Sequence, residues 1–218
     1  MRSKFDEQLL QLNHEMIEMG ALCEEVIALS SRALTEGNVA LAAKVGPLDS
    51  EIDHKEREIE NLCLKLLLRQ QPVARDLRQI SAALKMITDM ERIGDQAEDI
   101  AEIVAFLDGR QAENDALLKE MAKAVIQMVT ESVDAYVKCD IMLAKKVIAA
   151  DDGVDEQFAR VKQSLIGKIA ADPADGEYAL DLLMIAKYYE RIGDHATNIA
   201  EWVIYSVTGT HKDEITLT

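Results

Sequence analysis

Residues that favour sheets, tight turns and cross-links are scarce in this sequence. Aromatic residues make up 4% of its 218 positions, and there are only three prolines and ten glycines. This scarcity points away from β-sheets and toward long helices. The three cysteines, Cys23, Cys63 and Cys139, are far apart and form no C-x-x-C pair. They predict neither a disulfide framework nor a thiolate zinc site, which fits a reducing compartment.

The sequence also lacks a long apolar run and an excess of positive charge. No stretch approaches the roughly 20 apolar residues of a membrane span, and the acidic residues within the N-terminal segment argue against a signal peptide. Forty acidic residues against twenty-four basic ones give a net charge of −16. This charge would repel a nucleic-acid backbone. We therefore expect a soluble cytoplasmic protein that does not bind nucleic acid.

What the sequence does have is helical periodicity. Apolar residues recur at spacings of three and four along nearly the whole chain, as on the buried face of an amphipathic helix. Asn38 and Asp140 are good N-cap residues, and Gly46 with Pro47 predicts a bend near the start of the second helix. The first expected helix ends at EGN (36–38), and the next three cover about 38–72, 75–107 and 114–139. A fifth starts after Asp140, and a sixth follows the break ADPADGE.

The two halves of the chain repeat one another. NVALAAKV at 38–45 is matched by DIMLAKKV at 140–147, and ERIGDQAEDIAE at 91–102 by ERIGDHATNIAE at 190–201. Each half is interpreted as a three-helix unit, and the two units must share a core because three amphipathic helices cover one another incompletely. The predicted fold is all-α, a six-helix up-and-down bundle made of two tandem three-helix repeats with pseudo-twofold symmetry. The predicted boundaries are 1–110 and 111–207 for the repeats and 208–218 for a loose tail.

Pairs of carboxylates four residues apart recur on two helices of each half. Residues four apart lie on one face of a helix, so each pair forms a two-pronged set of oxygens. Where the two helices are neighbours, four carboxylates can converge on a hard cation such as iron, manganese or magnesium, with zinc as a weaker fit. The candidate metal ligands are Asp49, Asp53, Glu91, Asp95, Asp151, Asp155, Glu190 and Asp194.

These pairs also have a simpler interpretation. In an acidic helical chain such spacings arise by chance. Arg92 and Arg191, which lie beside the pairs, can neutralise the carboxylates across helices, or a basic partner can supply the opposite charge. Gly94 and Gly193 lie in the same motif and indicate a close approach, either of a packed neighbour or of a bound group. A single E-x-x-H step, ending at His54, falls short of the paired steps of a di-iron bundle, so His54 is expected at the surface.

The duplicated motif resembles the PhoU family of phosphate-uptake regulators. The resemblance rests on the two ERIGD stretches and on the D-x-x-I-D and D-x-x-V-D steps of the preceding helices, and it covers nearly the whole chain. It implies a non-enzymatic negative regulator of the phosphate-starvation response; the sequence has no nucleophile elbow and no phosphate-cradling glycine loop. The implied partners are the ATPase subunit of the phosphate ABC transporter and the phosphate sensor histidine kinase, with a homodimer as the expected assembly.

The resemblance also bears on the metal. Some PhoU-like proteins carry iron or another metal on the acid-x-x-x-acid steps and others are metal-free, so the eight carboxylates above are implied ligands and no cofactor is required. Asn198 stands where the first half has Asp99, which predicts a weaker second site. Two other interpretations stay open: a carboxylate-bridged metal store or oxidase, and a helical adaptor unrelated to phosphate.

Overall fold

The computed structural model describes residues 2–70, 72–107 and 116–210. Within these ranges the chain forms six long helices, two short ones and no strand. The long helices are α1 (Arg2–Glu36), α3 (Val45–Gln70), α4 (Ala74–Phe106), α5 (Ala116–Lys138), α6 (Ile141–Ala171) and α7 (Gly176–Thr208), and the short ones are α2 (Val39–Ala42) and the 3-10 helix η1 (Pro173–Asp175). The predicted all-α bundle of two three-helix repeats is confirmed.

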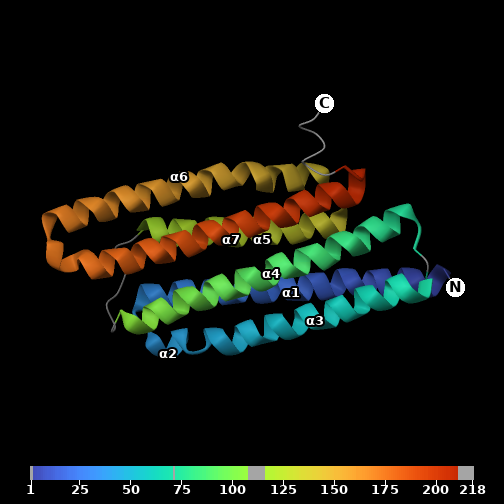
Figure 1. The fold of residues 1–218 in the computed structure, drawn as a ribbon, viewed down its shortest axis with the longest axis horizontal. Coiled ribbons are helices and arrows are strands. Elements are labelled where there is room, and N and C mark those ends of the chain that lie inside the picture. Colours follow the sequence, from blue (N-terminus) through green and yellow to red (C-terminus); the bar gives the residue numbers. More distant parts are fainter. Residues whose placement is uncertain (1, 71, 108–115, 211–218) are drawn as a thin grey trace.

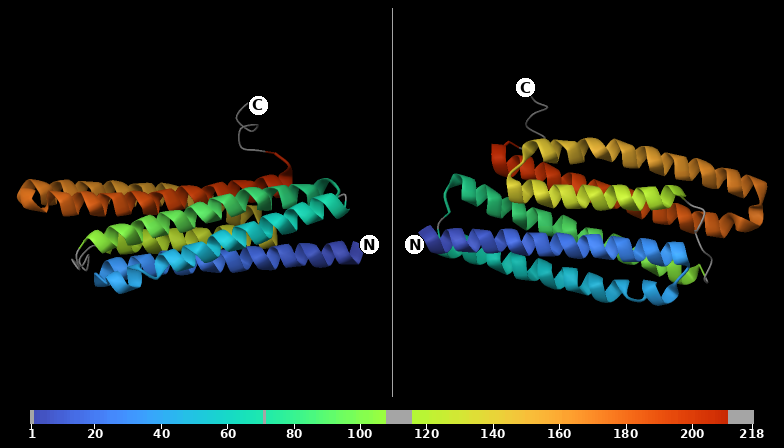
Figure 2. Two further views of the ribbon diagram at one scale, coloured as in Figure 1. Left: turned by 60° about the horizontal axis from the view of Figure 1, so that its bottom comes forward. Right: turned by 180° about the vertical axis from the view of Figure 1, so that it is seen from behind.

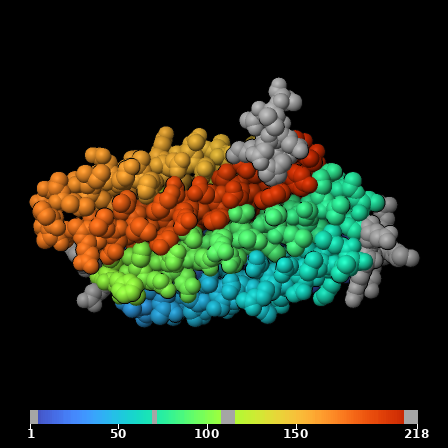
Figure 3. Space-filling model, viewed as in Figure 1, coloured from blue at the N-terminus to red at the C-terminus, as the bar shows by residue number. Residues whose placement is uncertain are grey.

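The helices form two layers. Figure 1 shows α3, α4, α7 and α6 side by side in this order, and the space-filling view in Figure 3 shows that they make one continuous face. The view from behind in Figure 2 shows α1 and α5 on the other side, where α1 packs against α3 and α4, and α5 against α6 and α7. The third helices of the two repeats, α4 and α7, meet at the centre. We call the layer of α3, α4, α7 and α6 the four-helix face.

Equivalent turns start the second helix of each repeat. The side chain of Asn38 accepts a hydrogen bond from the Leu41 backbone N–H at 3.1 Å, and Asp140 accepts one from Leu143 at 3.0 Å. Just before each cap the chain takes a left-handed conformation, with φ of 58° at Gly37 and 51° at Cys139. Side-chain acceptors at this position satisfy backbone donors that a helix start leaves unpaired. Both N-caps were predicted from the sequence.

The second helix of the first repeat is broken earlier than predicted. The sequence suggested one helix with a bend at Gly46 and Pro47, but the chain forms α2, turns at residues 43–44 and begins α3 at Val45. Pro47 then lies in the first turn of α3, where its missing N–H leaves no helical hydrogen bond unmade. The equivalent segment of the second repeat is unbroken and forms the start of α6.

One hydrophobic core is shared by both repeats. All six long helices contribute fully buried side chains, for example Met16, Ile52, Met86, Val129, Val147 and Ile192. The predicted repeat boundary at 110–111 lies outside the described residues, and so does most of the predicted tail. The first residue of that tail, Thr208, is the last residue of α7. None of the described helices is both long and apolar enough to cross a membrane.

Candidate functional site: two acidic clusters

The four predicted carboxylate pairs lie on the four helices of the four-helix face, one pair on each helix. Since α3 packs against α4 and α6 against α7, each repeat brings its two pairs together. In the first repeat, the charges of Asp53, Asp95 and Glu91 all act on Asp49. In the second repeat, Asp194 and Asp155 act in the same way on Asp151, the residue equivalent to Asp49.

The first repeat adds two carboxylates that the sequence analysis missed. Glu56 follows Asp53 by three residues on α3, and Glu98 follows Asp95 by three on α4. We call the resulting set the first acidic cluster: Asp49, Asp53, Glu56, Glu91, Asp95 and Glu98. Burial, and then neighbouring carboxylates, raise the pKa of Glu56, Glu91 and Glu98. Extending each pair to the pattern i, i+4, i+7, which stays on one face of a helix, would have found both residues.

Asp49 is the innermost member of the first acidic cluster. Its residue surface is only 7% exposed, and its Oδ1 atom accepts no hydrogen bond from any described residue. This oxygen packs directly over Gly94, where a Cβ atom would overlap it and would lie 3.1 Å from Cδ1 of Ile52. Burial, followed by the charge of Glu98, raises the pKa of Asp49 to about 7. Gly94 is therefore a notch that admits a buried carboxyl group.

The basic residues near this cluster bind along a helix. Arg92 places Nη1 2.7 Å from Oδ2 of Asp95 and Nε 3.3 Å from Oε2 of Glu91, all on α4. Arg57 lies 3.4 Å from Asp53 on α3. Across the helix interface, the charge of Arg92 acts on Glu56 of α3 and opposes the rise in its pKa, which is caused first by burial. The Arg92 side chain is 55% exposed, so these ion pairs are weak in water.

The second repeat compensates its carboxylates differently. We call Asp151, Asp155, Glu190 and Asp194 the second acidic cluster. Lys187 forms an ion pair with Glu190 and lies 5.7 Å from the ring centre of Phe158. Phe158 and Thr197 occupy the positions equivalent to Glu56 and Glu98.

Asp151 is the equivalent of Asp49, but its pKa is raised less and its contact with the motif glycine is less close. Burial, then Asp194 and Asp155, raise its pKa to about 6, and the nearby Thr197 hydroxyl opposes the shift. A Cβ atom at Gly193 would lie 3.3 Å from Oδ1 of Asp151, which is tight contact without overlap. The second acidic cluster is thus smaller and less strongly coupled than the first.

A polar seam lies between the two clusters, where α4 meets α7. His195 Nδ1 lies 2.9 Å from Oδ1 of Asp89, and Asn198 donates a hydrogen bond to the same oxygen at 3.0 Å. On the other side of the seam, Arg191 is exposed and its charge lowers the pKa of Asp99, against a larger effect of burial that raises it. Sequence reasoning placed Arg191 beside its own cluster and did not foresee these contacts between repeats.

The clusters supply oxygen ligands but do not form a closed coordination shell. Within the described ranges, no three His, Cys, Asp or Glu side chains are arranged as a ready metal site. His54, as expected, lies at the surface, where it contacts Glu58 at 3.3 Å. A cation at either cluster would find only carboxylate oxygens as side-chain ligands, a set that suits iron, manganese or magnesium better than zinc.

These features define a class of protein: a tandemly repeated helical bundle that carries one acidic cluster per repeat on a shared four-helix face. The family model of the PhoU domain matches residues 16–104 and again 118–203. The chain belongs to the PhoU family.

Relatives and solved structures agree over almost the full length. A phosphate-specific transport system accessory protein PhoU homolog of Clostridium acetobutylicum is 36% identical, with 97% of this chain and 98% of the relative covered. The crystal structure of PhoU from Pseudomonas aeruginosa is 34% identical and superposes with a TM-score of 0.88, covering 94% of this chain and all of that one. The phosphate transport system regulatory protein PhoU from Streptococcus pneumoniae is 25% identical, with a TM-score of 0.86 over 94% of this chain and 98% of the other.

Proposed function

We propose that this protein is an accessory regulator of phosphate transport that restrains the phosphate-starvation response when phosphate is plentiful. The match of both repeats to the PhoU domain is the observation that carries this proposal. Its relatives are named as accessory and regulatory proteins of phosphate transport, not as enzymes. The role proposed for this chain is accordingly non-enzymatic.

The proposed partners are the ATPase subunit of the phosphate ABC transporter and the phosphate sensor histidine kinase, met in the cytoplasm. The net charge of −16 and the acidic clusters on the four-helix face suit basic surfaces on such partners. Complementary charge speeds encounter and fixes the register of a complex more than it adds affinity. The proposed assembly is a homodimer that reaches the membrane only through these partners and does not bind nucleic acid.

A reporter strain tests this role. Deleting the gene in its own host should switch on a phosphate-starvation promoter in phosphate-rich medium, and a plasmid copy should restore repression. Co-purification from cells grown in high and low phosphate should recover the transporter ATPase or the kinase in amounts that depend on phosphate. Unchanged reporter output in the deletion strain would overturn the proposal, and partner recovery indifferent to phosphate would favour an unrelated helical adaptor.

As a second and separate function, we propose that the acidic clusters bind a metal ion. The unpartnered, buried Oδ1 atom of Asp49 supports this, because a buried polar atom without a partner is unfavourable and a cation would satisfy it. Iron, manganese or magnesium would be held in the first repeat by Asp49, Asp53, Glu91 and Asp95. The second set comprises Asp151, Asp155, Glu190 and Asp194.

Elemental analysis tests the metal proposal. The untagged protein is incubated with iron, manganese, magnesium and zinc in turn and desalted, beside a variant with Asp53, Asp95, Asp155 and Asp194 changed to Asn. A matched control changes four aspartates outside the clusters, namely Asp6, Asp76, Asp134 and Asp181. Ion retained by the native protein and the control but lost by the cluster variant is the expected result. No retention, or equal retention by all three proteins, would overturn it, and metal-dependent oxygen consumption would instead indicate an oxidase.

A further inference from the structure

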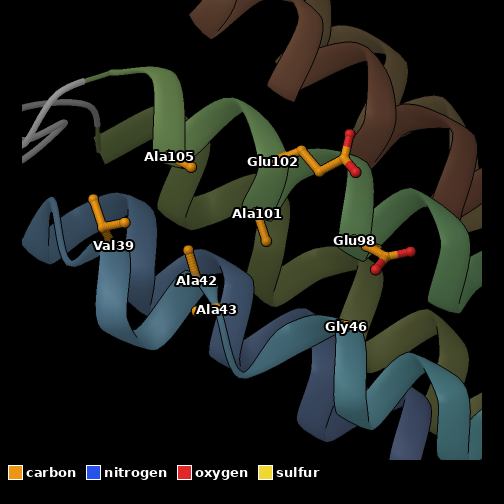
Figure 4. A pocket seen from close by; sticks show the side chains of 8 residues that line it. All are labelled: Val39, Ala42, Ala43, Gly46, Glu98, Ala101, Glu102 and Ala105. Carbon is orange, nitrogen blue, oxygen red and sulfur yellow. The ribbon is translucent and has the colours of Figure 1, made fainter.

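A small pocket opens beside the first acidic cluster, where the chain breaks between α2 and α3. It has a volume of about 230 Å³ and lies between α2 and α4 (Figure 4). Its walls are short apolar side chains, and Gly46 at the start of α3 forms part of the floor. The apolar wall residues are Val39 and Ala42 from α2, Ala43 from the turn after it, and Ala101 and Ala105 from α4.

Two carboxylates stand at the edge of this pocket. Glu98 and Glu102 are one helical turn apart on α4, as Figure 4 shows, and both belong to the pocket lining. No lysine or arginine of the described part of the chain forms an ion pair with either. Glu98 leans so far over the start of α3 that its Oε1 atom would lie 2.7 Å from a Cβ atom at Gly46. The pocket therefore combines an apolar interior with an uncompensated negative rim.

Among the described residues of the second repeat, larger side chains stand at several positions equivalent to the pocket lining. The positions of Gly46 and Ala105 are taken there by Ile148 and Ile204, whose side chains pack against the core, and the position of Glu98 is taken by Thr197. The helix break is also missing, because α6 runs without interruption from Ile141. Gly46, Ala105, Glu98 and the helix break thus occur together in the first repeat and are replaced together in the second, which keeps alanine and glutamate at the positions of Ala42, Ala101 and Glu102.

We propose that this pocket receives an arginine side chain of a partner protein. The aliphatic stem of the arginine would lie against the alanines while its guanidinium group pairs with Glu98 and Glu102. Long basic side chains bury their stems along apolar surface and keep the charge at the rim. Arginine fits better than lysine because its planar group binds carboxylates with two parallel hydrogen bonds and is more weakly hydrated.

A protein partner is favoured because the pocket continues into a larger charged surface. Glu98 is also a member of the first acidic cluster, so a basic segment that inserts an arginine would meet further carboxylates along α3 and α4. The inference rests on the proposed regulatory role, since it names the chemistry by which a regulatory partner would recognise this face. It adds one anchoring position to that role.

Methyl NMR tests the arginine pocket directly. Protein labelled at alanine, valine and isoleucine methyl groups is titrated with the peptide acetyl-Gly-Ser-Arg-Ser-Gly-amide and with the same peptide carrying neutral citrulline in place of arginine. Saturable shifts are expected at Ala42, Ala101 and Ala105, with no response at Ile148 and Ile204. We expect the arginine peptide to bind about tenfold more tightly than the citrulline peptide, which is about 1.4 kcal/mol.

Variants sharpen the same experiment. Ala105→Ile, which copies the second repeat, should weaken arginine binding about tenfold or more, whereas Ala149→Ile at an exposed position of α6 should leave it unchanged. Glu98→Gln should reduce the preference for arginine over citrulline. Equal binding of the two peptides, or binding indifferent to Ala105→Ile, would overturn the arginine pocket even if the reporter strain shows normal repression. An unaltered reporter in the deletion strain would overturn the regulatory role instead, so the two failures are distinguishable.

Discussion

The two acidic clusters are built on the same repeated motif, yet they differ in the number of carboxylates and in the basic residues that pair with them. The first acidic cluster has six carboxylates, and its basic neighbours, Arg57 and Arg92, bind from the exposed side. The second has four carboxylates, and Lys187 forms an ion pair with one of them while lying against Phe158. The first repeat thus gathers more negative charge on its part of the four-helix face than the second does.

This difference shows where function is to be sought. Carboxylates with raised pKa values and no matching cations lower the stability of the isolated protein, so they are expected where a ligand or partner supplies the missing charge. Asp49 and Glu98 of the first acidic cluster meet this description, and Glu98 also lines the pocket. In the second acidic cluster Asp151 is the comparable group, and its pKa is raised less.

The largest expected difference between the repeats is at the two motif glycines. Gly94→Ala should lower the free energy of unfolding by about 2 kcal/mol, because overlap with buried Asp49 costs about 3 kcal/mol and alanine returns about 1 through helix propensity. Gly193→Ala should change it by less than about 0.5 kcal/mol, since its nearest contact is 3.3 Å. Urea unfolding measures both. Gly153→Ala, at a glycine with nothing within 4 Å, calibrates the helix gain alone, and equal effects at Gly94 and Gly193 would contradict the comparison.

A smaller effect is expected from the buried carboxyl groups, and it depends on pH. Burial raises the pKa of Asp49 from its ordinary value of 3.8 to about 7 in the folded protein, so its stabilising contribution is complete below about pH 3.8 and is lost as pH rises through about 7. Asp49→Asn removes this penalty and should stabilise the protein by about 1 kcal/mol more at pH 8 than at pH 5.

Asp151→Asn is the matched variant in the second repeat. The folded pKa of Asp151 is raised only to about 6, so the gain should be smaller and should level off at lower pH. Urea unfolding at intervals from pH 5 to pH 8 measures both variants. A gain that does not vary with pH for Asp49→Asn would show that ionisation of this group does not limit stability.

The helices and the duplication could be predicted from the sequence better than the structural differences between the two repeats. Apolar spacing and the caps at Asn38 and Asp140 specified the helices, because these signals are local. The duplication specified that paired acids would meet, since equal positions in repeats have equal surroundings. The break at residues 43–44 was misplaced because Pro47 is compatible with a first helical turn, so a proline there does not locate the break.

Contacts between repeats were beyond the reach of local patterns. Asp89 and His195 are 106 residues apart, and no spacing rule links them. Lys187 was missed although it lies three residues before Glu190, a spacing that places the two on one helix face. The pocket could not be foreseen either, because it depends on how closely α2 approaches α4, and small side chains alone are equally compatible with close packing.

The smallest expected effect concerns Lys187, whose compensation of the second acidic cluster can be removed or transferred. Lys187→Thr installs the residue found at the equivalent position, Thr88, and should lower stability by about 0.5 kcal/mol, since the lysine side chain is 44% exposed and its ion pair is screened by water. The reciprocal Thr88→Lys should stabilise the first repeat by a similar amount by placing a cation beside Glu91. Both effects should shrink in 1 M salt because surface charges are then screened within about 3 Å. Urea unfolding at pH 8 in low and high salt measures them, and a loss in Lys187→Thr that persists undiminished in salt would assign the stabilisation to packing on Phe158 instead of to charge.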